Sequence, residues 1–252
     1  MIEYAIEYLS SIDSTNTYLK KLAQNGALEG KVVVAREQSA GRGRNGRSFF
    51  SSGGLGIYMS ILLRPNFSMQ DASRLTCLAA VAVARAIEPY SKTPVGIKWV
   101  NDIFIGGKKV CGILTESASA DGRRPEYVVV GIGLNLCAPP EGFPPEIKSV
   151  ATALFEDMRP AKEAYEPIIR SVLDNFYELY QGWDERAFIL EYAERSILKG
   201  CRVSVDNREG IVLRIDERCR LCVRFDDGEE LAIASGEAVS PQYPNLHERA
   251  LL

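Results

Sequence analysis

The sequence predicts an α+β fold, in which a mixed, mainly antiparallel sheet with flanking helices is followed by a small all-β unit. Three observations support this prediction. Strand-like and helix-like apolar patterns alternate through residues 1–198. Gly106 and Gly107 separate two apolar runs, which is typical of an antiparallel hairpin and argues against a wholly parallel sheet. From residue 199 onward, short alternating runs are separated by Gly, Asp and Asn. We therefore predict two domains, residues 1–198 and 199–252.

The individual elements are predicted from apolar periodicity and from signals at their ends. Asp13 or Ser14 can cap the first helix, and Gly26 can end it. The predicted elements of the first domain are a helix within 11–26, strands at 31–37 and 54–65, a helix at 69–88, a hairpin at 96–117, a strand at 127–136 and helices across about 160–195. Those of the second domain are strands within 201–207, 210–217, 220–227 and 230–235.

Composition argues against several classes of protein. The net charge of −3 gives no broad electrostatic footprint for nucleic acid. The first 14 residues lack the basic segment and long apolar core of a signal peptide, and no run reaches the roughly 18 apolar residues that span a bilayer. A cytoplasmic location without a membrane partner is therefore expected. The single histidine, His247, lies in a polar tail, so a mechanism that needs a histidine base or metal ligand is not expected.

The six cysteines lie mostly in apolar runs, which is typical of buried, reduced thiols. Cys219 and Cys222 form a CxxC motif, which can be half of a zinc site or a redox pair. No second CxxC and no nearby histidine accompany it, and Cys219, Leu221, Val223 and Phe225 alternate as the buried side of a strand would. Two strand residues are the favoured interpretation, and no structural metal is expected.

A glycine-rich loop with three arginines, GRGRNGRSFF at residues 41–50, is the first candidate site. Glycine lets backbone N–H groups approach an anion closely, and Arg42, Arg44 and Arg47 offer guanidinium groups that match carboxylate or phosphate oxygens. No Walker A lysine follows, and no helix opens there as in a dinucleotide-binding motif. A solvated loop or an RG-type nucleic-acid arm explains this composition as well.

The glycine hairpin places charged groups on one face of otherwise apolar strands. A two-residue turn pairs Asp102 with Cys111 and makes Asp102 and Lys109 diagonal neighbours, while Lys98 shares their face. A solvent-facing ladder of ion pairs is the alternative, and a one-residue change of register would reverse the faces.

The strand at 127–136 has an unusual face. Gly131, Gly133 and Asn135 alternate onto one side, which leaves room for a flat ligand against the backbone. A bulge or close helix packing accounts for these glycines equally well.

Polar side chains at the first helix form a last candidate. Ser14, Thr15 and Asn16, with Gln38 at a strand end, offer hydroxyl and amide groups that suit a neutral ring such as a urea. Helix capping is the simpler explanation for the first three.

Four motifs, in order, make the sequence similar to the biotin–protein ligases. They are SIDSTNTYL, EQSAGRGRNGRSFF, KWVNDIFIGGKKVCGIL and VGIGLNL, within roughly residues 10–137. The resemblance implies a catalytic domain related to class II aminoacyl-tRNA synthetases and lipoate ligases, with a C-terminal SH3-like β-barrel. Repressor members of the family carry an N-terminal helix-turn-helix domain. Because the motifs start near residue 10, a short form that does not bind DNA is expected.

The resemblance also implies roles for individual residues. The biotin-binding residues of the family match Ser14, Thr15, Asn16, Gln38, Arg42, Gly43, Arg44, Lys109, Gly112, Gly131 and Gly133. The ATP-binding residues match Arg44, Asn45, Arg47, Phe49, Asn101, Asp102, Lys109 and Asn135. Lys109, Arg44 and Arg42 are the expected catalytic residues. The sequence departs from the family at Val100, usually Pro, and at Phe49, often Trp.

The implied reaction is a two-step acyl activation, with ATP and biotin as substrates. The carboxylate of biotin attacks the α-phosphorus of ATP, and biotinyl-5′-AMP then reacts with a lysine of a biotin carboxyl carrier domain. The arginine loop is expected to be mobile when empty, because three unpaired arginines repel one another, and to close over the adenylate. Mg²⁺ would bridge the phosphates, with Asp102 as a candidate ligand. A homodimer follows only by analogy with family members that pair through a sheet edge.

Three alternatives stay open at this point. A lipoate–protein ligase shares the fold and the chemistry, although GRGRNGR and KWVND favour biotin. A nucleic-acid-binding protein with an RG arm is disfavoured by the net charge of −3. A non-catalytic biotin sensor is disfavoured because all the expected charged residues are present.

Overall fold

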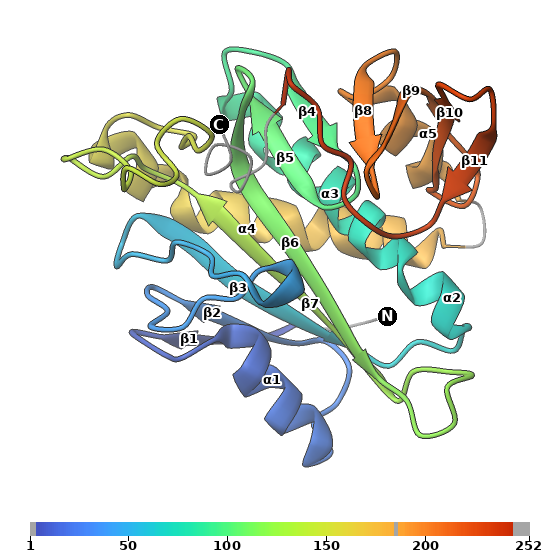
Figure 1. The fold of residues 1–252 in the computed structure, drawn as a ribbon. Helices are drawn as coiled ribbons and strands as arrows, with labels where there is room; N and C mark the ends of the chain where they lie inside the picture. The colour runs from blue at the N-terminus through green and yellow to red at the C-terminus, as the bar shows by residue number, and fades with distance from the viewer. Residues whose placement is uncertain (1–3, 184–185, 244–252) are drawn as a thin grey trace.

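The computed structural model describes residues 4–183 and 186–243. Its larger part is a seven-stranded sheet in the order β1-β2-β3-β7-β6-β5-β4 (Figure 1). β1 and β2 pair in parallel, and the other neighbours are antiparallel, so the predicted mixed, mainly antiparallel sheet is confirmed. Its strands are β1 (Ala5–Leu9), β2 (Lys31–Ala35), β3 (Gly56–Leu63), β4 (Val95–Lys98), β5 (Asp102–Ile105), β6 (Lys108–Ala118) and β7 (Tyr127–Asn135).

Helices cover both faces of this sheet. α1 lies on one face, and α3 and α4 lie on the opposite face (Figure 1). α3 is rich in alanine and almost completely buried, because small side chains let it pack closely between the sheet and α4. The helices are α1 (Thr15–Gln24), η1 (Arg44–Gly46), α2 (Met69–Ala72), α3 (Arg74–Ile87), η2 (Glu88–Tyr90), α4 (Met158–Gln181) and α5 (Ala187–Glu194).

The α1 face of the sheet is apolar at one end and polar at the other. Leu19 of α1 packs in a small cluster with Val33, Leu62 and Val129. Strand alternation then brings Gly131 and Gly133 to the same face as Val129, beyond the N-terminus of α1. The polar start of α1 therefore lies beside a strip of sheet without large side chains.

Several predicted boundaries differ from the structure. β1 was not predicted, because it lies at the edge of the sheet, where its exposed and half-buried side chains do not alternate as in a typical strand. The helix predicted at 69–88 breaks at Ser73 into α2 and α3. The hairpin predicted at 96–117 is wrong in its first arm. The chain turns back at residues 99–101 and forms two strands, β4 and β5, in place of one.

The C-terminal part is a four-stranded antiparallel sheet in the order β11-β10-β9-β8. Its strands are β8 (Arg202–Val205), β9 (Arg208–Ile215), β10 (Leu221–Phe225) and β11 (Glu230–Ile233). Its buried side chains, such as Val205 and Val223, belong to the same continuous core as Val130 of the large sheet. The indole N–H of Trp99 also donates to the Cys219 carbonyl at 3.0 Å. The predicted boundary between residues 198 and 199 stays a prediction.

The CxxC motif is not a strand pair. Cys219 lies in the turn before β10 with a φ of 59°, and Cys222 lies in β10, so the strand prediction is wrong for Cys219. Both thiols are buried and free. Among the described residues, no helix combines the length and the apolarity that crossing a bilayer requires. His247 lies outside the described residues.

Candidate active site

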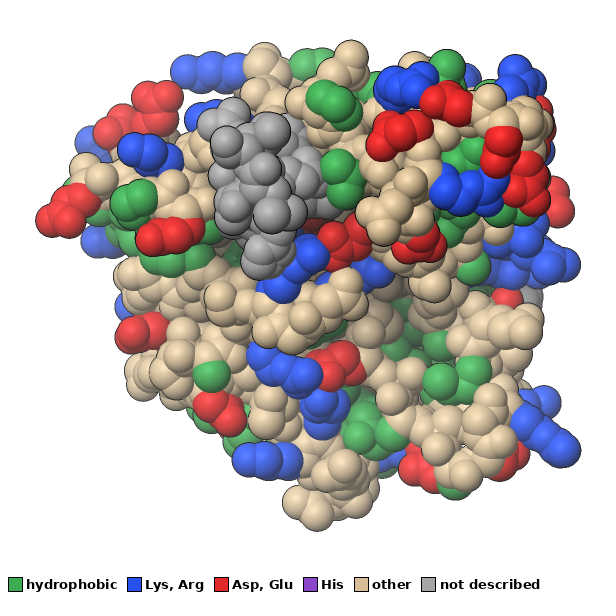
Figure 2. Space-filling view, viewed as in Figure 1, with side chains coloured by type: hydrophobic (Ala, Val, Ile, Leu, Met, Phe, Trp, Pro, Cys, Tyr) green, Lys and Arg blue, Asp and Glu red, His purple; other side chains and the backbone are tan. Residues whose placement is uncertain are grey.

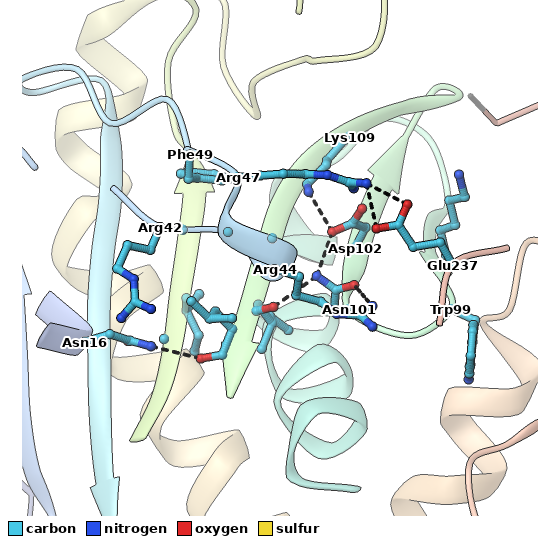
Figure 3. A pocket seen from close by; sticks show the side chains of 18 of the residues that line it. Asn16, Arg42, Arg44, Arg47, Phe49, Trp99, Asn101, Asp102, Lys109 and Glu237 are labelled. Carbon is cyan, nitrogen blue, oxygen red and sulfur yellow. Dashed lines mark hydrogen bonds and ion pairs between the residues drawn. The ribbon is translucent and has the colours of Figure 1, made fainter. Parts of the chain in front are cut away.

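One cavity gathers most of the predicted site residues (Figure 3). Its walls come from the start of α1, the arginine loop, β4 to β7 and residues 236–238. The predicted residues that line it are Ser14, Thr15, Asn16, Gln38, Arg42, Gly43, Arg44, Arg47, Phe49, Asn101, Asp102, Lys109, Gly112, Gly131 and Gly133. Asn45 and Asn135 do not line it. The volume of the cavity is about 100 Å³.

A hydrogen-bond network fixes the start of α1. The Thr15 backbone N–H and hydroxyl donate to Gln38 Oε1 at 2.9 and 3.1 Å. The fully buried Ser60 hydroxyl lies 2.7 Å from Thr15 Oγ1 and 2.6 Å from Asn16 Oδ1. Ser14 caps the helix by accepting from Thr17 N–H, which confirms one of the two predicted caps. Ser60 was not singled out from the sequence, although a serine in the otherwise apolar and aromatic run of β3 is a usable signal.

Asn16 explains the glycine at position 131. Its amide donates to the Leu114 carbonyl at 3.1 Å and to Glu116 at 2.9 Å. A Cβ atom on Gly131 would lie 2.2 Å from Asn16 Oδ1. The space above Gly131, predicted to receive a flat ligand, therefore holds the side chain of Asn16.

Glu116 is a central acidic residue that sequence reasoning missed. Its carboxylate lies 2.7 Å from Lys20 Nζ and 3.0 Å from Arg42 Nη1, and it also accepts from Asn16. Burial alone would raise the pKa of Glu116, but hydrogen bonds from Lys20 and Asn16 and the charges of Lys20 and Arg42 lower it. Glu116 thus holds Arg42 and Asn16 in place as an ionised group at neutral pH.

The hairpin of β5 and β6 brings Lys109 and Asp102 together. Lys109 Nζ lies 2.7 Å from Asp102 Oδ1, which confirms that they are neighbours (Figure 3). The predicted register is wrong, because Asp102 opposes Gly112 and not Cys111. The turn pairs Phe104 with Lys109 as expected, but an irregularity follows and shifts the ladder by one residue.

Lys98 supplies a further cation at the cavity wall. It lies on β4 directly opposite Asp102 and is almost fully buried. Its ammonium group donates to the Tyr243 carbonyl. The predicted grouping of Lys98 with Asp102 and Lys109 is therefore found, since all three line the cavity.

Each arginine of the loop has a partner in this structure (Figure 3). Arg42 pairs with Glu116, and Arg47 pairs with Glu237 at 2.7 Å. Arg44 donates to Asn101 Oδ1 at 3.0 Å and to the Gly236 carbonyl at 3.1 Å. The expectation of three unpaired, mutually repelling arginines is therefore wrong. On the face in Figure 2, basic and acidic side chains likewise lie next to each other around a central hollow.

Phe49 covers the remaining glycines of the site. A Cβ atom on Gly133 would lie 2.5 Å from its ring, and one on Gly112 would lie 3.2 Å from it. Lys109 Nζ lies 5.9 Å from the centre of the ring. The ring thus fills the second part of the strip that was predicted to bind a flat ligand.

Two predicted ATP-binding residues have other contacts. Asn135 donates to the Thr152 carbonyl at 2.9 Å and so holds the loop that follows β7. Asn45 has a φ of 55° and donates to Glu237 at 2.9 Å. The structure does not bring either side chain into the cavity.

Metal-binding groups are sparse in the described part of the chain. No cluster of three or more His, Cys, Asp or Glu side chains is found there that could hold a metal ion. Asp102, the predicted ligand, is paired with Lys109. A metal at this place would therefore need most of its ligands from a bound substrate.

The site combines two chemical environments. Neutral hydroxyl and amide groups from α1 and Gln38 line one part of the cavity, and Arg42 lies beside them because it shares Glu116 with Asn16. The other cationic groups that line the cavity are those of Arg44, Arg47, Lys98 and Lys109. Such a cavity suits a ligand with an uncharged polar ring and an anionic end, next to a polyanion.

A family model for the biotin/lipoate A/B protein ligase family matches residues 8–135. The chain belongs to this family. The matched segment includes all four motifs up to Asn135, and with them every predicted site residue.

Individual relatives agree with the family assignment. A relative in Mycobacterium tuberculosis, biotin–[acetyl-CoA-carboxylase] ligase, is 30% identical over 93% of this chain and 88% of its own length. The bifunctional ligase/repressor BirA of Bacillus subtilis is 46% identical over 59% of this chain, but the match spans only 46% of that relative, about half of its length.

The structural neighbours agree as well. The biotin protein ligase from Aquifex aeolicus, solved in complex with biotin and ATP, superposes with a TM-score of 0.72. It is 27% identical, and the superposition covers 92% of this chain and 97% of that one.

Proposed function

We propose that this protein is an ATP-dependent biotin–protein ligase, which activates biotin to biotinyl-5′-AMP and transfers the biotinyl group to a lysine of a biotin carboxyl carrier domain. The main support is the convergence of Lys109 and the loop arginines on one cavity, whose other side offers neutral hydrogen-bonding groups. The names of the relatives support the same activity. A cytoplasmic location fits this reaction and stays part of the proposal.

The two sides of the cavity would hold the two substrates. The neutral groups of Thr15, Asn16 and Gln38 match the donors and acceptors of a ureido ring, and the ring would lie against β7. Arg44 and Arg47 would hold the phosphates of ATP, with Asn101 beside them. Lys109 lies between these two regions and would contact the carboxylate of biotin and the α-phosphate.

The chemical step needs charge neutralisation more than it needs a protein nucleophile. The attacking carboxylate and the triphosphate repel each other by about 4 kcal/mol at about 4 Å and an effective dielectric of about 20. Lys109 and the loop arginines would offset this repulsion and align the carboxylate oxygen with the α-phosphorus. As the bond from the carboxylate oxygen to the α-phosphorus forms, the bond from that phosphorus to the oxygen bridging the α- and β-phosphates breaks, and pyrophosphate leaves with that oxygen. Lys109 must first release Asp102 to take up this role.

Mg²⁺ fits the site only with help from the nucleotide. Asp102 is the candidate carboxylate, and a magnesium ion bound through one carboxylate and several phosphate oxygens is common in nucleotide-dependent enzymes. Bound there, the ion would supply further positive charge to the phosphates. Once the ion pair with Lys109 is broken, Asp102 would be available to Mg²⁺, and Lys109 would be available to the biotin carboxylate and the α-phosphate.

The loop must move to admit the substrates. The cavity of about 100 Å³ is smaller than the roughly 300–1,000 Å³ of most ligand sites. Phe49 covers Gly112 and Gly133, and Arg42 is held by Glu116. Residues 41–50 would therefore move away to admit the substrates and then close over the adenylate, which would protect the mixed anhydride from water.

Two finer features of the fold belong to the same proposal. The seven-stranded sheet would be of the class II aminoacyl-tRNA synthetase type. The C-terminal sheet would be an SH3-like barrel, for which the isolated antiparallel bridge from Ser204 on β8 to Val239 gives support. Transfer to the carrier lysine would not require DNA or a membrane.

Exchange of labelled pyrophosphate into ATP tests the proposed activity. Exchange that depends on biotin, and is at background level with lipoate, is expected. Exchange that depends on lipoate instead would assign the protein to the other branch of its family. No exchange with either acid would contradict the adenylation proposal altogether.

A further inference from the structure

Glu237 places a negative charge inside the cationic side of the cavity. Both of its carboxylate oxygens lie 2.7 Å from Arg47 Nη2, and one of them accepts from the Asn45 amide at 2.9 Å (Figure 3). Both Arg47 and Asn45 belong to the loop, whereas Glu237 follows β11, 190 residues later in the chain. The contact therefore joins segments that lie far apart in the sequence.

The neighbouring residues add to this contact, and we call the contacts of Arg44, Asn45 and Arg47 with Gly236 and Glu237 the latch. The carbonyl of Gly236 accepts from Arg44 at 3.1 Å, and Gly236, Glu237 and Ala238 all line the cavity. Three side chains of the loop are thus held by two consecutive residues of the C-terminal segment. Within the described residues, no other segment after residue 198 lines this cavity besides 236–238.

The chemistry of Glu237 resembles that of the proposed substrate. A carboxylate presents oxygens to a guanidinium group as a phosphate does, so both compete for the same donors. Burial alone would raise the pKa of Glu237, but hydrogen bonds from Arg47 and Asn45 and the charges of Arg47 and Arg44 lower it. The group is therefore ionised near neutral pH. It accepts the hydrogen bonds of the Arg47 guanidinium that phosphate oxygens would accept in the ATP complex.

We propose that Glu237 is an internal counter-anion, which holds the arginine loop against the C-terminal segment in the nucleotide-free protein and yields Arg47 to the phosphates of ATP. This inference rests on the proposed function for the identity of the anion. Glu237 then has two effects. It keeps the empty loop ordered over the cavity, and it makes ATP binding weaker by the free energy of the contact that ATP must break.

The substitution Glu237→Gln separates charge from shape. Glutamine keeps the length of the side chain and an acceptor oxygen, but it removes the anion that competes with phosphate. We expect the KM for ATP to fall about two- to fivefold, the range of a partly exposed ion pair, while the KM for biotin changes less than twofold. The matched control is Glu230→Gln, which removes a surface ion pair with Arg224 elsewhere in the C-terminal sheet.

Limited trypsin digestion measures the latch without any substrate. Arg42, Arg44 and Arg47 are cleavage sites, and cleavage requires the loop to open. Without ligands, the Glu237→Gln protein should be cut within residues 41–50 about two- to fivefold faster than the wild type and the Glu230→Gln control. Addition of biotin with MgATP should slow cleavage of both the wild type and the Glu237→Gln variant.

The outcomes distinguish this inference from the proposed function. Equal cleavage rates, or a KM for ATP that is unchanged or higher in Glu237→Gln, would overturn the inference in an active enzyme. A wild type without biotin-dependent pyrophosphate exchange would refute the proposed function and, with it, the role of ATP as the competing anion. Faster cleavage of the variant would then support the latch alone.

Discussion

At the scale of single residues, the site is a set of charges that are already paired before any ligand binds. Lys109 holds Asp102, Arg42 holds Glu116, and Arg47 holds Glu237. Ion pairing orients these side chains and leaves no unpaired charge among them in a partly closed cavity. Substrate anions would exchange with these carboxylates as partners of the same cations.

Lys109→Ala tests the proposed catalytic lysine. Removal of the ammonium group takes away the cation closest to the expected carboxylate and α-phosphate, so biotin-dependent pyrophosphate exchange should fall by about 100-fold or more. Lys108→Ala is the matched control, because Lys108 is exposed and contacts only the Lys148 carbonyl in the described chain, at 3.5 Å. Equal rates in the two variants would refute the role of Lys109.

Glu116→Gln tests the acidic residue that holds Arg42. The folded-state pKa of Glu116 lies below its ordinary value of 4.5, so its contribution to stability is present above pH 4.5 and is lost as the pH falls through the folded-state value. The wild type should therefore be more stable than Glu116→Gln at neutral pH, and the difference should narrow below pH 4.5. Urea unfolding at several pH values measures it. A difference that stays constant with pH would contradict the assignment.

At the scale of elements, the site depends on the contact between α1 and β7. Thr15 and Asn16 reach the sheet because Ser60 on β3 and Gly131 on β7 leave a polar gap in an otherwise apolar face. Further along α1, apolar side chains such as Leu19 pack on the same face of the sheet. Because this apolar packing and the polar residues Thr15 and Asn16 belong to one helix, the packing fixes the position of the two polar side chains.

Gly131→Ala tests this contact. The new methyl group would lie 2.2 Å from Asn16 Oδ1 and must displace it, since the Asn16 amide is held on its other side by Leu114 and Glu116. We expect a loss of about 1–3 kcal/mol in the free energy of unfolding and a higher KM for biotin. A stable variant with an unchanged KM for biotin would show that Asn16 does not bind the ring.

The sequence could predict these elements where local signals are strong. The Gly106-Gly107 turn and the Ser14 cap were predicted because turn and cap residues act within a few positions. The register beyond Phe104 was not, because a turn fixes only the pairs next to it. The edge strand β1 and the break at Ser73 depend on tertiary packing, which leaves little local trace.

At the scale of the whole molecule, the two sheets share one core and one site. Glu116 and Glu237 could not be predicted from the sequence, because their partners Arg42 and Arg47 lie 74 and 190 positions away. The cations that the motifs suggested do line one cavity, but the anions that hold Arg42 and Arg47 come from a remote strand and from the C-terminal segment. Only the folded chain brings them together.

Trp99→Phe tests the connection between the two parts of the chain. Phenylalanine keeps an aromatic ring but leaves the buried Cys219 carbonyl without its donor, so the free energy of unfolding should fall by about 1–3 kcal/mol. Because the core is continuous, unfolding should remain a single transition when followed by both far-UV circular dichroism and tryptophan fluorescence of Trp183. Two separate transitions would show that the parts unfold independently.

Native mass spectrometry of the protein incubated with biotin and MgATP tests the central proposal most directly. Retention of one biotinyl-5′-AMP is expected in the wild type, together with its loss in Lys109→Ala, because the cavity would both form and shelter the adenylate. A wild-type protein that carries intact ATP, free biotin or a lipoyl adenylate in its place would contradict the proposed reaction.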